Sequence, residues 1–296
     1  MSAIHPWLLA LSLGWASGAA ALETLTVCAD PNNLPFSNKA REGFENKIVE
    51  LVAQELDKQI SYVWWAQRRG YVRNTLNEAK CDLWPGVASG IERVATTRPY
   101  YRSTYVFVTR ASSHLQDLTL DDSRLRALSI GVQLIGNDAN NTPPAHAIAS
   151  RGIVANVHGY MLYGNYAHPN PPAAIMIAVA DGTVDVAMVW GPLAGYFAQR
   201  SSVALAVSPI TSLSPSPWPM TFDVSMGVQL QNGALLDEVN TALARRKAAI
   251  DDILRQYSVP SCVAPAPVAV QEVAGASECH LSEMVRRDGS RNNGTA

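Results

Sequence analysis

Strand-like and helix-like segments alternate through the first third of the chain, and this alternation constrains the fold most strongly. Two apolar runs of strand length, 25–29 and 60–65, enclose a segment, 44–56, in which apolar residues recur at helical spacing. A short helix over 73–79 and a third strand over 81–84 are expected to complete this unit. The order strand, helix, strand, helix, strand predicts a parallel sheet with right-handed crossovers.

The pattern starts again at residue 128, after a strongly β-prone run over 105–109. We expect that run to be one hinge strand and 222–228 to be a second, by which the chain returns to the first lobe. The predicted fold class is α/β, with two lobes joined by two hinge strands. The second lobe should contain strands at 128–132, 153–157 and 184–189 and helices from Thr142 to Gly152, over 171–182 and over 192–200. After the return to lobe one, one or two closing helices are expected within 235–257. The predicted organisation is a signal segment at 1–21, lobe one at 22–110 and 221–260, lobe two at 111–220, and a C-terminal tail at 261–296.

The N-terminus has the pattern of a secretory signal peptide. Residues 6–16 are mostly apolar but too few to span a bilayer, and Ala19-Ala20-Ala21 offers a small-residue cleavage site. The preceding segment has no Lys or Arg, only His5, so an uncleaved anchor or a different start codon stays an alternative. We expect cleavage and a periplasmic location. No later apolar run reaches about 18 residues, so membrane insertion is not expected.

The charge balance argues against several functional classes. With 23 Lys and Arg against 25 Asp and Glu in 296 residues, the formal net charge is -2, and no large basic patch suggests nucleic-acid binding. No nucleophile-elbow motif supports Ser/His/Asp catalysis. No metal or cofactor is predicted, because no ligand spacing relates His146, His158, His168 and His280.

Four cysteines, Cys28, Cys81, Cys262 and Cys279, are typical of an oxidising compartment. Three pairings are possible. We favour Cys28–Cys81, because two adjacent parallel strands would hold these residues within bridging distance, and Cys262–Cys279, which would tie back the tail. Buried free thiols are the alternative.

The segment 81–93 combines the features of a ligand-binding turn. Its strand ends in Pro-Gly, and small residues including Ala88 and Gly90 follow, which let a ligand approach the backbone. Arg93 could form paired hydrogen bonds with a carboxylate. The alternative is a solvent-exposed Glu92/Arg93 pair that contributes little.

Three further segments should reach the same cleft, at the carboxyl ends of the strands. Asp30, beside Asn33, could accept a hydrogen bond from a ligand amine or hydroxyl, or could form an ordinary Asx turn. A glycine-containing turn with Gln133 and Asn137 offers backbone N–H groups to an anion, or simply joins a strand to a helix. Trp190 either stacks on a ligand or partner at the cleft edge or fills the core.

The densest basic run holds Arg68, Arg69 and Arg73. A solvated face explains it without any function. As a rim of the cleft it would attract an acidic partner.

Several motifs, in order along the chain, match one family. The chain resembles the quinoprotein-dehydrogenase-associated solute-binding proteins of the MxaJ/XoxJ type, which accompany periplasmic methanol dehydrogenases, over residues 25–260. The motifs are VCADPNNLPFSN at 27–38, EGFEN at 42–46, QRRG at 67–70, RNTL at 73–76, TRPYYRSTYVF at 97–107, IGVQLIG at 130–136, TPPAHA at 142–147 and VWGPLAGY at 189–196.

The resemblance implies the bilobal periplasmic-binding-protein fold and a modified ligand site. In the wider superfamily of amino-acid-binding proteins, the positions of Arg93 and Asp30 bind the ligand. The hydroxyl residues that usually hold the ligand carboxylate are replaced here by Ala88 and Gly90, and the usual acid that holds the amine falls at Trp190. Each missing charged hydrogen bond costs about 1.5–3 kcal/mol. An ordinary amino-acid carrier is therefore not expected.

The resemblance favours a non-enzymatic periplasmic accessory protein that binds and helps mature or activate a PQQ-dependent methanol dehydrogenase. It does not separate the calcium-dependent from the lanthanide-dependent branch. The alternative is a small-molecule solute-binding protein of an ABC-type importer. An enzyme is a third hypothesis, but no general acid/base pair is placed for that work.

Overall fold

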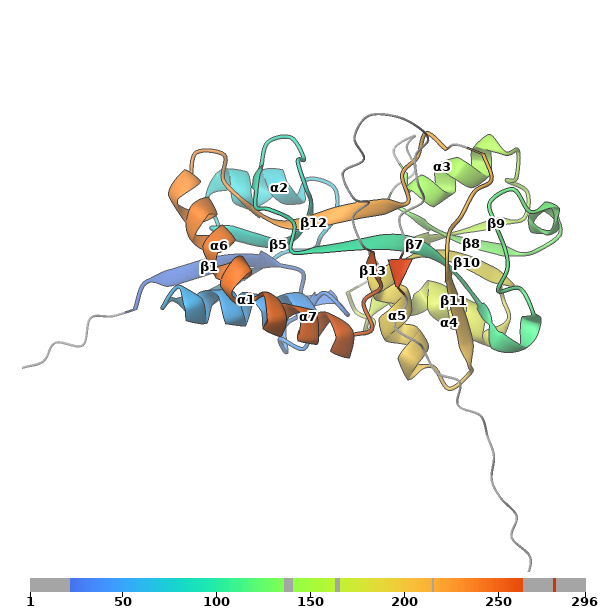
Figure 1. Cartoon of the computed structure of the whole chain (residues 1–296), viewed down its shortest axis with the longest axis horizontal. Helices are drawn as coiled ribbons and strands as arrows, with labels where there is room; N and C mark the ends of the chain where they lie inside the picture. Colours follow the sequence, from blue (N-terminus) through green and yellow to red (C-terminus); the bar gives the residue numbers. More distant parts are fainter. Residues whose placement is uncertain (1–21, 136–140, 163–165, 215, 263–278, 281–296) are drawn as a thin grey trace, which may run out of the picture.

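The computed structural model describes residues 22–135, 141–162, 166–214, 216–262 and 279–280. The described part forms two α/β lobes that lie side by side (Figure 1). Two long strands, β7 (Tyr101–Arg110) and β12 (Thr221–Val228), run between them. Lobe one is the half that contains the first strands of the chain, and lobe two is the half that contains the central part of the chain.

Lobe one is built on a parallel sheet in which β1 (Thr24–Ala29) lies between β4 (Gln59–Trp64) and β5 (Leu83–Ala88). This is the strand–helix alternation that the apolar pattern predicts. The smaller elements of this lobe are β2 (Asn32–Asn33), β3 (Ser37–Asn38), α2 (Tyr71–Asn74), the 3-10 turn η1 (Leu76–Glu78) and β6 (Ala95–Thr96).

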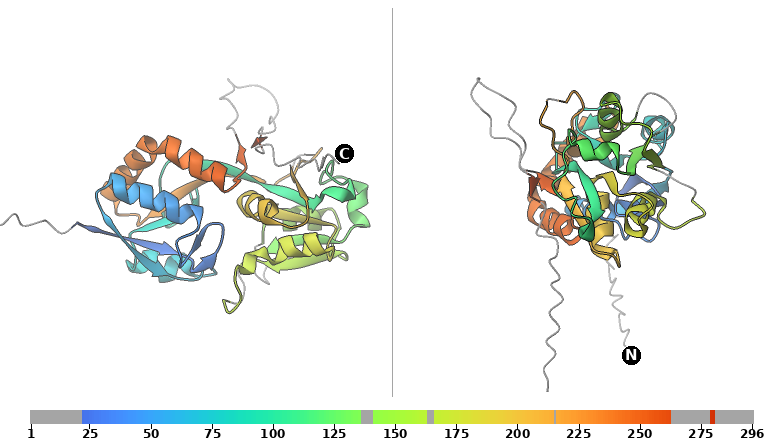
Figure 2. Two further views of the ribbon diagram at one scale, coloured as in Figure 1. Left: turned by 90° about the horizontal axis from the view of Figure 1, so that it is seen from below. Right: turned by 90° about the vertical axis from the view of Figure 1, so that its right-hand side faces the viewer.

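Helix α1 (Phe44–Glu55) lies in the connection from β1 to β4, two neighbouring strands of this parallel sheet. Phe44, Ile48 and Val52 are spaced by four residues and fully buried, so this stripe packs the helix onto the sheet. The Asn46 side chain accepts a hydrogen bond from the Gly43 backbone N–H at 3.3 Å and so fixes the first turn. Helices α6 (Gly233–Arg245) and α7 (Lys247–Gln256) lie beside α1 on the same face, as Figure 2 shows from a second direction.

Lobe two repeats the plan with β8 (Ile130–Leu134) between β9 (Val157–Met161) and β10 (Val186–Trp190), all parallel. Helix α3 (Pro143–Ser150) covers one face of this sheet, and α4 (Ala174–Asp181) and α5 (Gly191–Arg200) cover the other, so that two apolar clusters form its core. The remaining elements are β11 (Leu205–Pro209), β13 (Ser261–Cys262), β14 (Cys279–His280) and the 3-10 turns η2 (Ala111–Ser113), η3 (Ser123–Arg126) and η4 (Pro171–Ala173).

Strand β7 belongs to both lobes. Its first part pairs with β12, from Tyr101 to Thr104, and its remainder pairs with β10 and β11, from Tyr105 to Arg110. The sheets of the two lobes are thereby joined in the order β4-β1-β5-β12-β7-β10-β8-β9. The two expected hinge strands are present, and the expected lobe limits near residues 110, 220 and 260 stay predictions.

Strand β5 is longer than the sequence pattern predicts. The expected strand 81–84 becomes Leu83–Ala88, so Pro85 and Gly86 lie inside the strand. Proline has no N–H for a sheet ladder and is tolerated where pairing is irregular. The pairing of β5 with β12 shifts register between Ser225 and Gly227, which provides such an irregularity.

Strand β9 also differs from the prediction, which placed a strand over 153–157. Ile153 instead ends the helix region, because its N–H bonds to the Ile148 carbonyl at 3.3 Å and its side chain is buried in the core. The strand proper, Val157–Met161, lies at the sheet edge and has only partly buried and exposed residues. Its apolar signal is weak for that reason.

Candidate functional site

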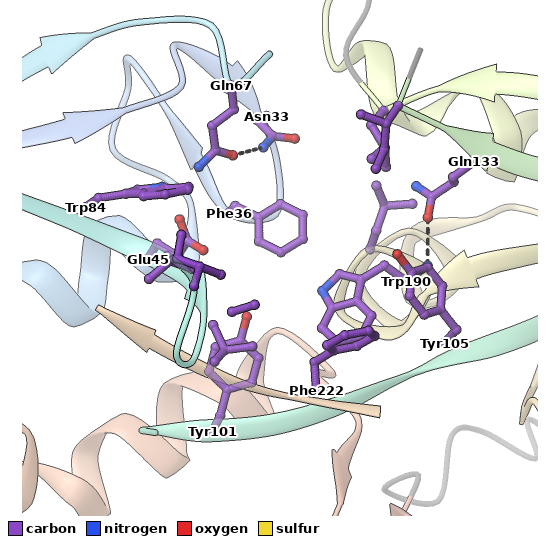
Figure 3. A pocket seen from close by; sticks show the side chains of 18 residues that line it. Asn33, Phe36, Glu45, Gln67, Trp84, Tyr101, Tyr105, Gln133, Trp190 and Phe222 are labelled. Carbon is purple, nitrogen blue, oxygen red and sulfur yellow. Dashed lines mark hydrogen bonds between the residues drawn. The ribbon is translucent and has the colours of Figure 1, made fainter. Parts of the chain in front are cut away.

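A cavity of about 500 Å³ lies between the lobes. This volume is within the range of small-molecule sites. Both lobes and both hinge strands contribute to its lining (Figure 3). The lining residues are Asn33, Phe36, Glu45, Gln67, Trp84, Gly86, Val87, Ala88, Ile91, Tyr101, Tyr105, Gln133, Ile135, Leu162, Trp190, Leu193, Phe222 and Val224.

Aromatic rings form much of the cavity wall. Tyr105 on β7, Trp190 at the end of β10 and Phe222 on β12 contact one another, with ring centroids 5.1–6.4 Å apart and steeply inclined planes. Phe36 and Trp84 face this group from lobe one (Figure 3). A ligand in the cavity would therefore meet flat apolar surfaces from both lobes.

Hydrogen bonds fix the polar groups of the lining. The Trp190 backbone N–H donates to Gln133 Oε1 at 2.8 Å, which holds the end of β10 against β8. On the opposite side, Asn33 Nδ2 donates to Gln67 Oε1 at 3.1 Å. These amides are held in place before any ligand arrives, which favours a preformed site.

Glu45 carries the carboxyl group of the lining and is only 3% exposed. Burial raises the pKa of this carboxyl to about 8, and the nearby Asp30 carboxyl adds to the rise. A group in the first turn of a helix, α1, with a pKa in this range changes its charge near neutral pH. Glu45 is therefore the residue through which the cavity can respond to a proton or to a cation.

We predict that Glu45 makes the stability of the protein fall as the pH rises. Below a pH of about 4.5 both the folded and the unfolded chain hold the proton, whereas between about 4.5 and 8 only the folded chain does. The folded state thus loses at most about 5 kcal/mol of stability across this window, and Glu45→Gln should remove this loss. Free energies of unfolding in urea at pH 5, 6, 7 and 8 would measure it. Glu50→Gln, on the same helix but one-third exposed, is the matched control, and parallel pH profiles for wild type and Glu45→Gln would contradict the prediction.

Asp30 is buried beside the cavity but does not line it. Its carboxylate accepts hydrogen bonds from the backbone N–H groups of Asn32 at 2.9 Å and Gln67 at 2.6 Å. The Tyr166 hydroxyl of lobe two donates a third at 2.6 Å. Asp30 thus forms the Asx turn that was the alternative to a ligand contact, and through Tyr166 it also connects the two lobes.

A second contact between the lobes lies next to the first. Asn32 Nδ2 donates to the His168 carbonyl at 2.8 Å, and the Asn170 N–H donates back to Asn32 Oδ1 at 3.0 Å. Together with the Asp30–Tyr166 bond, these contacts hold the cleft closed on one side. The sequence gives no sign of them, because they join residues more than 130 positions apart.

The other predicted cleft residues divide into two groups. Ala88 lines the cavity, as Asn33, Gln133 and Trp190 do. Gly90 and Arg93 lie outside the lining and are exposed, and Arg93 has a φ of 67°. β5 continues to Ala88, and of the turn that follows it Ile91 reaches the cavity lining whereas Arg93 does not. The anion contact expected of Arg93 is therefore not part of this cavity, and Asn137 lies outside the described residues.

The basic run is exposed at the edge of lobe one. Arg68, Arg69 and Arg73 all have exposed side chains, next to Gln67 of the lining. Burial and the bond to Asp30 raise the pKa of Tyr166, and the positive charge of Arg68 opposes that rise. Arg68 therefore lies close to the contact between the lobes.

Both expected disulfides are present. Cys28 pairs with Cys81 between β1 and the start of β5, and both residues are buried. Cys262 pairs with Cys279 between β13 and β14, which fastens part of the tail to the body of the protein. Within the described residues, no group of three or more His, Cys, Asp and Glu side chains could hold a metal ion. No helix in the same residues is long and apolar enough to cross a membrane.

Sequence reasoning missed Glu45, Tyr105 and Phe222 as lining residues. Glu45 stands in the first helical turn, where an acid is ordinary, so only its position beside Gly86 in the fold distinguishes it. Phe222 and Tyr105 stand on the predicted hinge strands. Because hinge strands pass between the two lobes, the position of these residues on such strands could have indicated that they line the cleft.

Residues 25–259 match the family of bacterial extracellular solute-binding proteins, family 3. The match covers most of the chain and both lobes, so the chain belongs to this family. The bilobal fold predicted from the sequence is thereby confirmed.

Within this family the chain is of the MoxJ/XoxJ type. It is 32% identical over 250 residues to Protein MoxJ of Methylorubrum extorquens AM1, covering 80% of this chain and 81% of the relative. The periplasmic binding protein XoxJ from Methylobacterium extorquens AM1 is 39% identical, with a TM-score of 0.66 over 81% of this chain and 100% of that one. MxaJ from Methlophaga aminisulfidivorans MPT is 25% identical, with a TM-score of 0.67 over 80% and 99% of the two chains.

Proposed function

We propose that this chain is a non-enzymatic periplasmic accessory protein that binds and helps mature or activate a PQQ-dependent methanol dehydrogenase. It would be exported by the signal segment at 1–21 and would act after cleavage of that segment. The similarity to MoxJ, MxaJ and XoxJ supports the link to methanol oxidation. The cleft and its rim, with Arg68, Arg69 and Arg73, are the proposed contact surface.

The observation that carries the proposal is the absence of an amino-acid site from the described cavity. Its lining has no Arg, Lys or His that could pair with a ligand carboxylate. Asp30, which would receive the amine, is bonded to Tyr166. A carboxylate ligand would lose its hydration without gaining an ion pair, so an ordinary amino-acid carrier is disfavoured. The family resemblance suggests that the ligand of this cleft is a partner protein.

Catalysis has no evident basis in this cavity. The described lining holds one carboxyl group, Glu45, two tyrosines of raised pKa, Tyr101 and Tyr105, and no histidine. General acid–base chemistry needs a second group that titrates near the operating pH. A binding role therefore agrees better with the lining than an enzymatic one.

We expect charge reversal of the rim to weaken the association. Changing Arg68, Arg69 and Arg73 together to Glu should lower the affinity for the dehydrogenase about tenfold or more at low salt, because long-range attraction would become repulsion. Surface-plasmon measurements at two salt concentrations would show the effect mainly in the association rate. The control reverses Arg245, Lys247 and Arg255, which are 68–71% exposed on α6 and α7, across lobe one from α2. Equal affinity of the rim variant and the wild type would remove the rim from the proposal.

A small-molecule carrier is the second candidate, because the cavity volume of about 500 Å³ suits a ligand of moderate size. A carried solute would raise the melting temperature by mass action. A screen of alcohols, acids, amines and PQQ by thermal shift tests this candidate, and stabilisation by one solute without any binding to the dehydrogenase would favour it.

A further inference from the structure

Among the described residues, the buried carboxyl of Glu45 has no hydrogen-bond or ion-pair partner. Its side chain is 97% removed from solvent, and no described residue donates a hydrogen bond to its carboxyl or forms an ion pair with it. The carboxyl faces the cavity between Trp84 and Phe36 (Figure 3). A buried polar group without a partner is costly, so a ligand that satisfies this carboxyl would gain that interaction on binding.

The fold makes room for this carboxyl. A Cβ at position 86 would lie 1.9 Å from Glu45 Oε1, so any side chain there would displace the Glu45 carboxyl from its present place. Gly86 itself lines the cavity. The Glu45 carboxyl thus lies against the backbone of β5 at Gly86, in the cavity wall.

The rest of the wall suits a positive charge. Six aromatic rings line the cavity, and the face of an aromatic ring attracts a cation. The described lining contains no Arg, Lys or His that would repel a cation or neutralise Glu45. Glu45 supplies the charge, and the rings are those of Phe36, Trp84, Tyr101, Tyr105, Trp190 and Phe222.

We propose that the cavity is a binding site for a small organic ammonium ion, whose charged nitrogen pairs with Glu45 and whose apolar body packs against the aromatic wall. This inference concerns the cavity itself and does not rest on the proposed association with a dehydrogenase. An anion is disfavoured because it would meet Glu45 without a counter-charge. A neutral alcohol could enter but would satisfy the carboxyl less well than a charged donor does.

The test compares two probes of nearly equal shape, cyclohexylammonium and cyclohexanol, by calorimetric titration at pH 8. Wild type should bind the ammonium ion at least tenfold more tightly than the alcohol. Glu45→Gln should reduce the affinity for the ammonium ion about 10- to 100-fold and change that for cyclohexanol less than threefold. Glu50→Gln, outside the cavity on the same helix, should behave as wild type. Equal affinity for the two probes in the wild type would overturn the proposal.

A pH series gives an independent readout, because Glu45 must release its proton to pair with the cation. The groups that influence Glu45 are Asp30 after β1, Tyr62 on β4, Tyr71 on α2, Tyr100 before β7 and Tyr101 on β7. The pKa values of these tyrosines are raised, chiefly by burial, so they stay neutral in this range. Affinity for cyclohexylammonium should rise more than about tenfold from pH 6 to pH 8 in the wild type and stay level in Glu45→Gln. A level profile in the wild type would contradict the assignment to Glu45.

A second variant keeps the test open if Glu45→Gln fails to fold. Phe222→Leu removes one ring of the wall and should lower affinity for the ammonium ion roughly three- to tenfold, with the affinity for cyclohexanol nearly unchanged.

A lysine side chain of a partner protein would offer the same ammonium group as a free amine. N-acetyl-lysine amide distinguishes these sources: tighter binding than cyclohexylammonium assigns the site to a peptide, and weaker binding assigns it to a free amine.

Discussion

Gly43→Ala is expected to destabilise the protein by about 3 kcal/mol or more, because the added methyl group has no space. Its Cβ would lie 2.0 Å from the Phe36 carbonyl oxygen and 2.5 Å from the Ser37 backbone nitrogen. These are main-chain atoms, and the Phe36 carbonyl already accepts a hydrogen bond from the Glu45 N–H at 3.0 Å. Relief of the clash would therefore break the contact that joins this loop to the start of α1.

The change should also affect the cavity, since Phe36 and Glu45 both line it. Urea unfolding measures the stability, and titration with cyclohexylammonium measures the site. Gly233→Ala is the matched control: it lies at the start of α6, nothing lies within 4 Å of its added Cβ, and it should be neutral or stabilising by up to about 1 kcal/mol. Equal destabilisation by the two changes would show that close packing at Gly43 is not the cause.

Removal of the Cys28–Cys81 disulfide by a double change to alanine is expected to cost about 4 kcal/mol. The bridge closes a loop with a sequence separation of 53, and its loss gives that entropy back to the unfolded chain. Both sulfurs lie in the core between β1 and the start of β5, where small cavities would add to the cost. Melting temperature and urea midpoint should both fall.

The Cys262–Cys279 pair provides the comparison for this effect. Its sequence separation is 17, and it joins only β13 to β14, so its removal should cost less, about 3 kcal/mol at most. Reduction of both disulfides in the wild type should lower the stability by the sum of the two losses. A larger effect from the tail disulfide than from Cys28–Cys81 would contradict the view that the buried bridge holds lobe one together.

Local pattern was sufficient to predict most of the fold. The apolar spacing of Phe44, Ile48 and Val52 predicts α1 because one buried stripe decides the period of a helix. The extent of β5 could not be predicted in the same way. Pro85 and Gly86 usually end strands, and only the irregular pairing with β12 lets them continue one.

The candidate site was predictable only in part. Trp190, Ala88, Asn33 and Gln133 stand at strand ends, which the topology brings to the cleft, and they line the cavity. Asp30 was expected either to meet a ligand or to form an Asx turn, and its bond from the Asn32 N–H is that turn. The bond from Tyr166 could not be predicted, because a contact between lobes has no local sequence pattern. The role of Glu45 could not be predicted from the sequence either, because its raised pKa results from burial that only the assembled fold creates.

The cavity chemistry bears on both candidate roles. An aromatic cleft with one acid and, among its described residues, no basic group is a poor site for an α-amino acid. It is a better site for a positively charged group, whether free or carried by a partner. The hinge strands β7 and β12 supply Tyr105 and Phe222 to its wall, so motion of the lobes would open or close it.

The most direct measurement is a calorimetric titration of the mature protein against a PQQ-dependent methanol dehydrogenase, with the cofactor-free and cofactor-loaded enzyme side by side. The proposed accessory role predicts saturable binding that is tighter for the cofactor-free form. Absence of heat and of co-elution with either form would contradict that role and leave a small-molecule carrier as the better account.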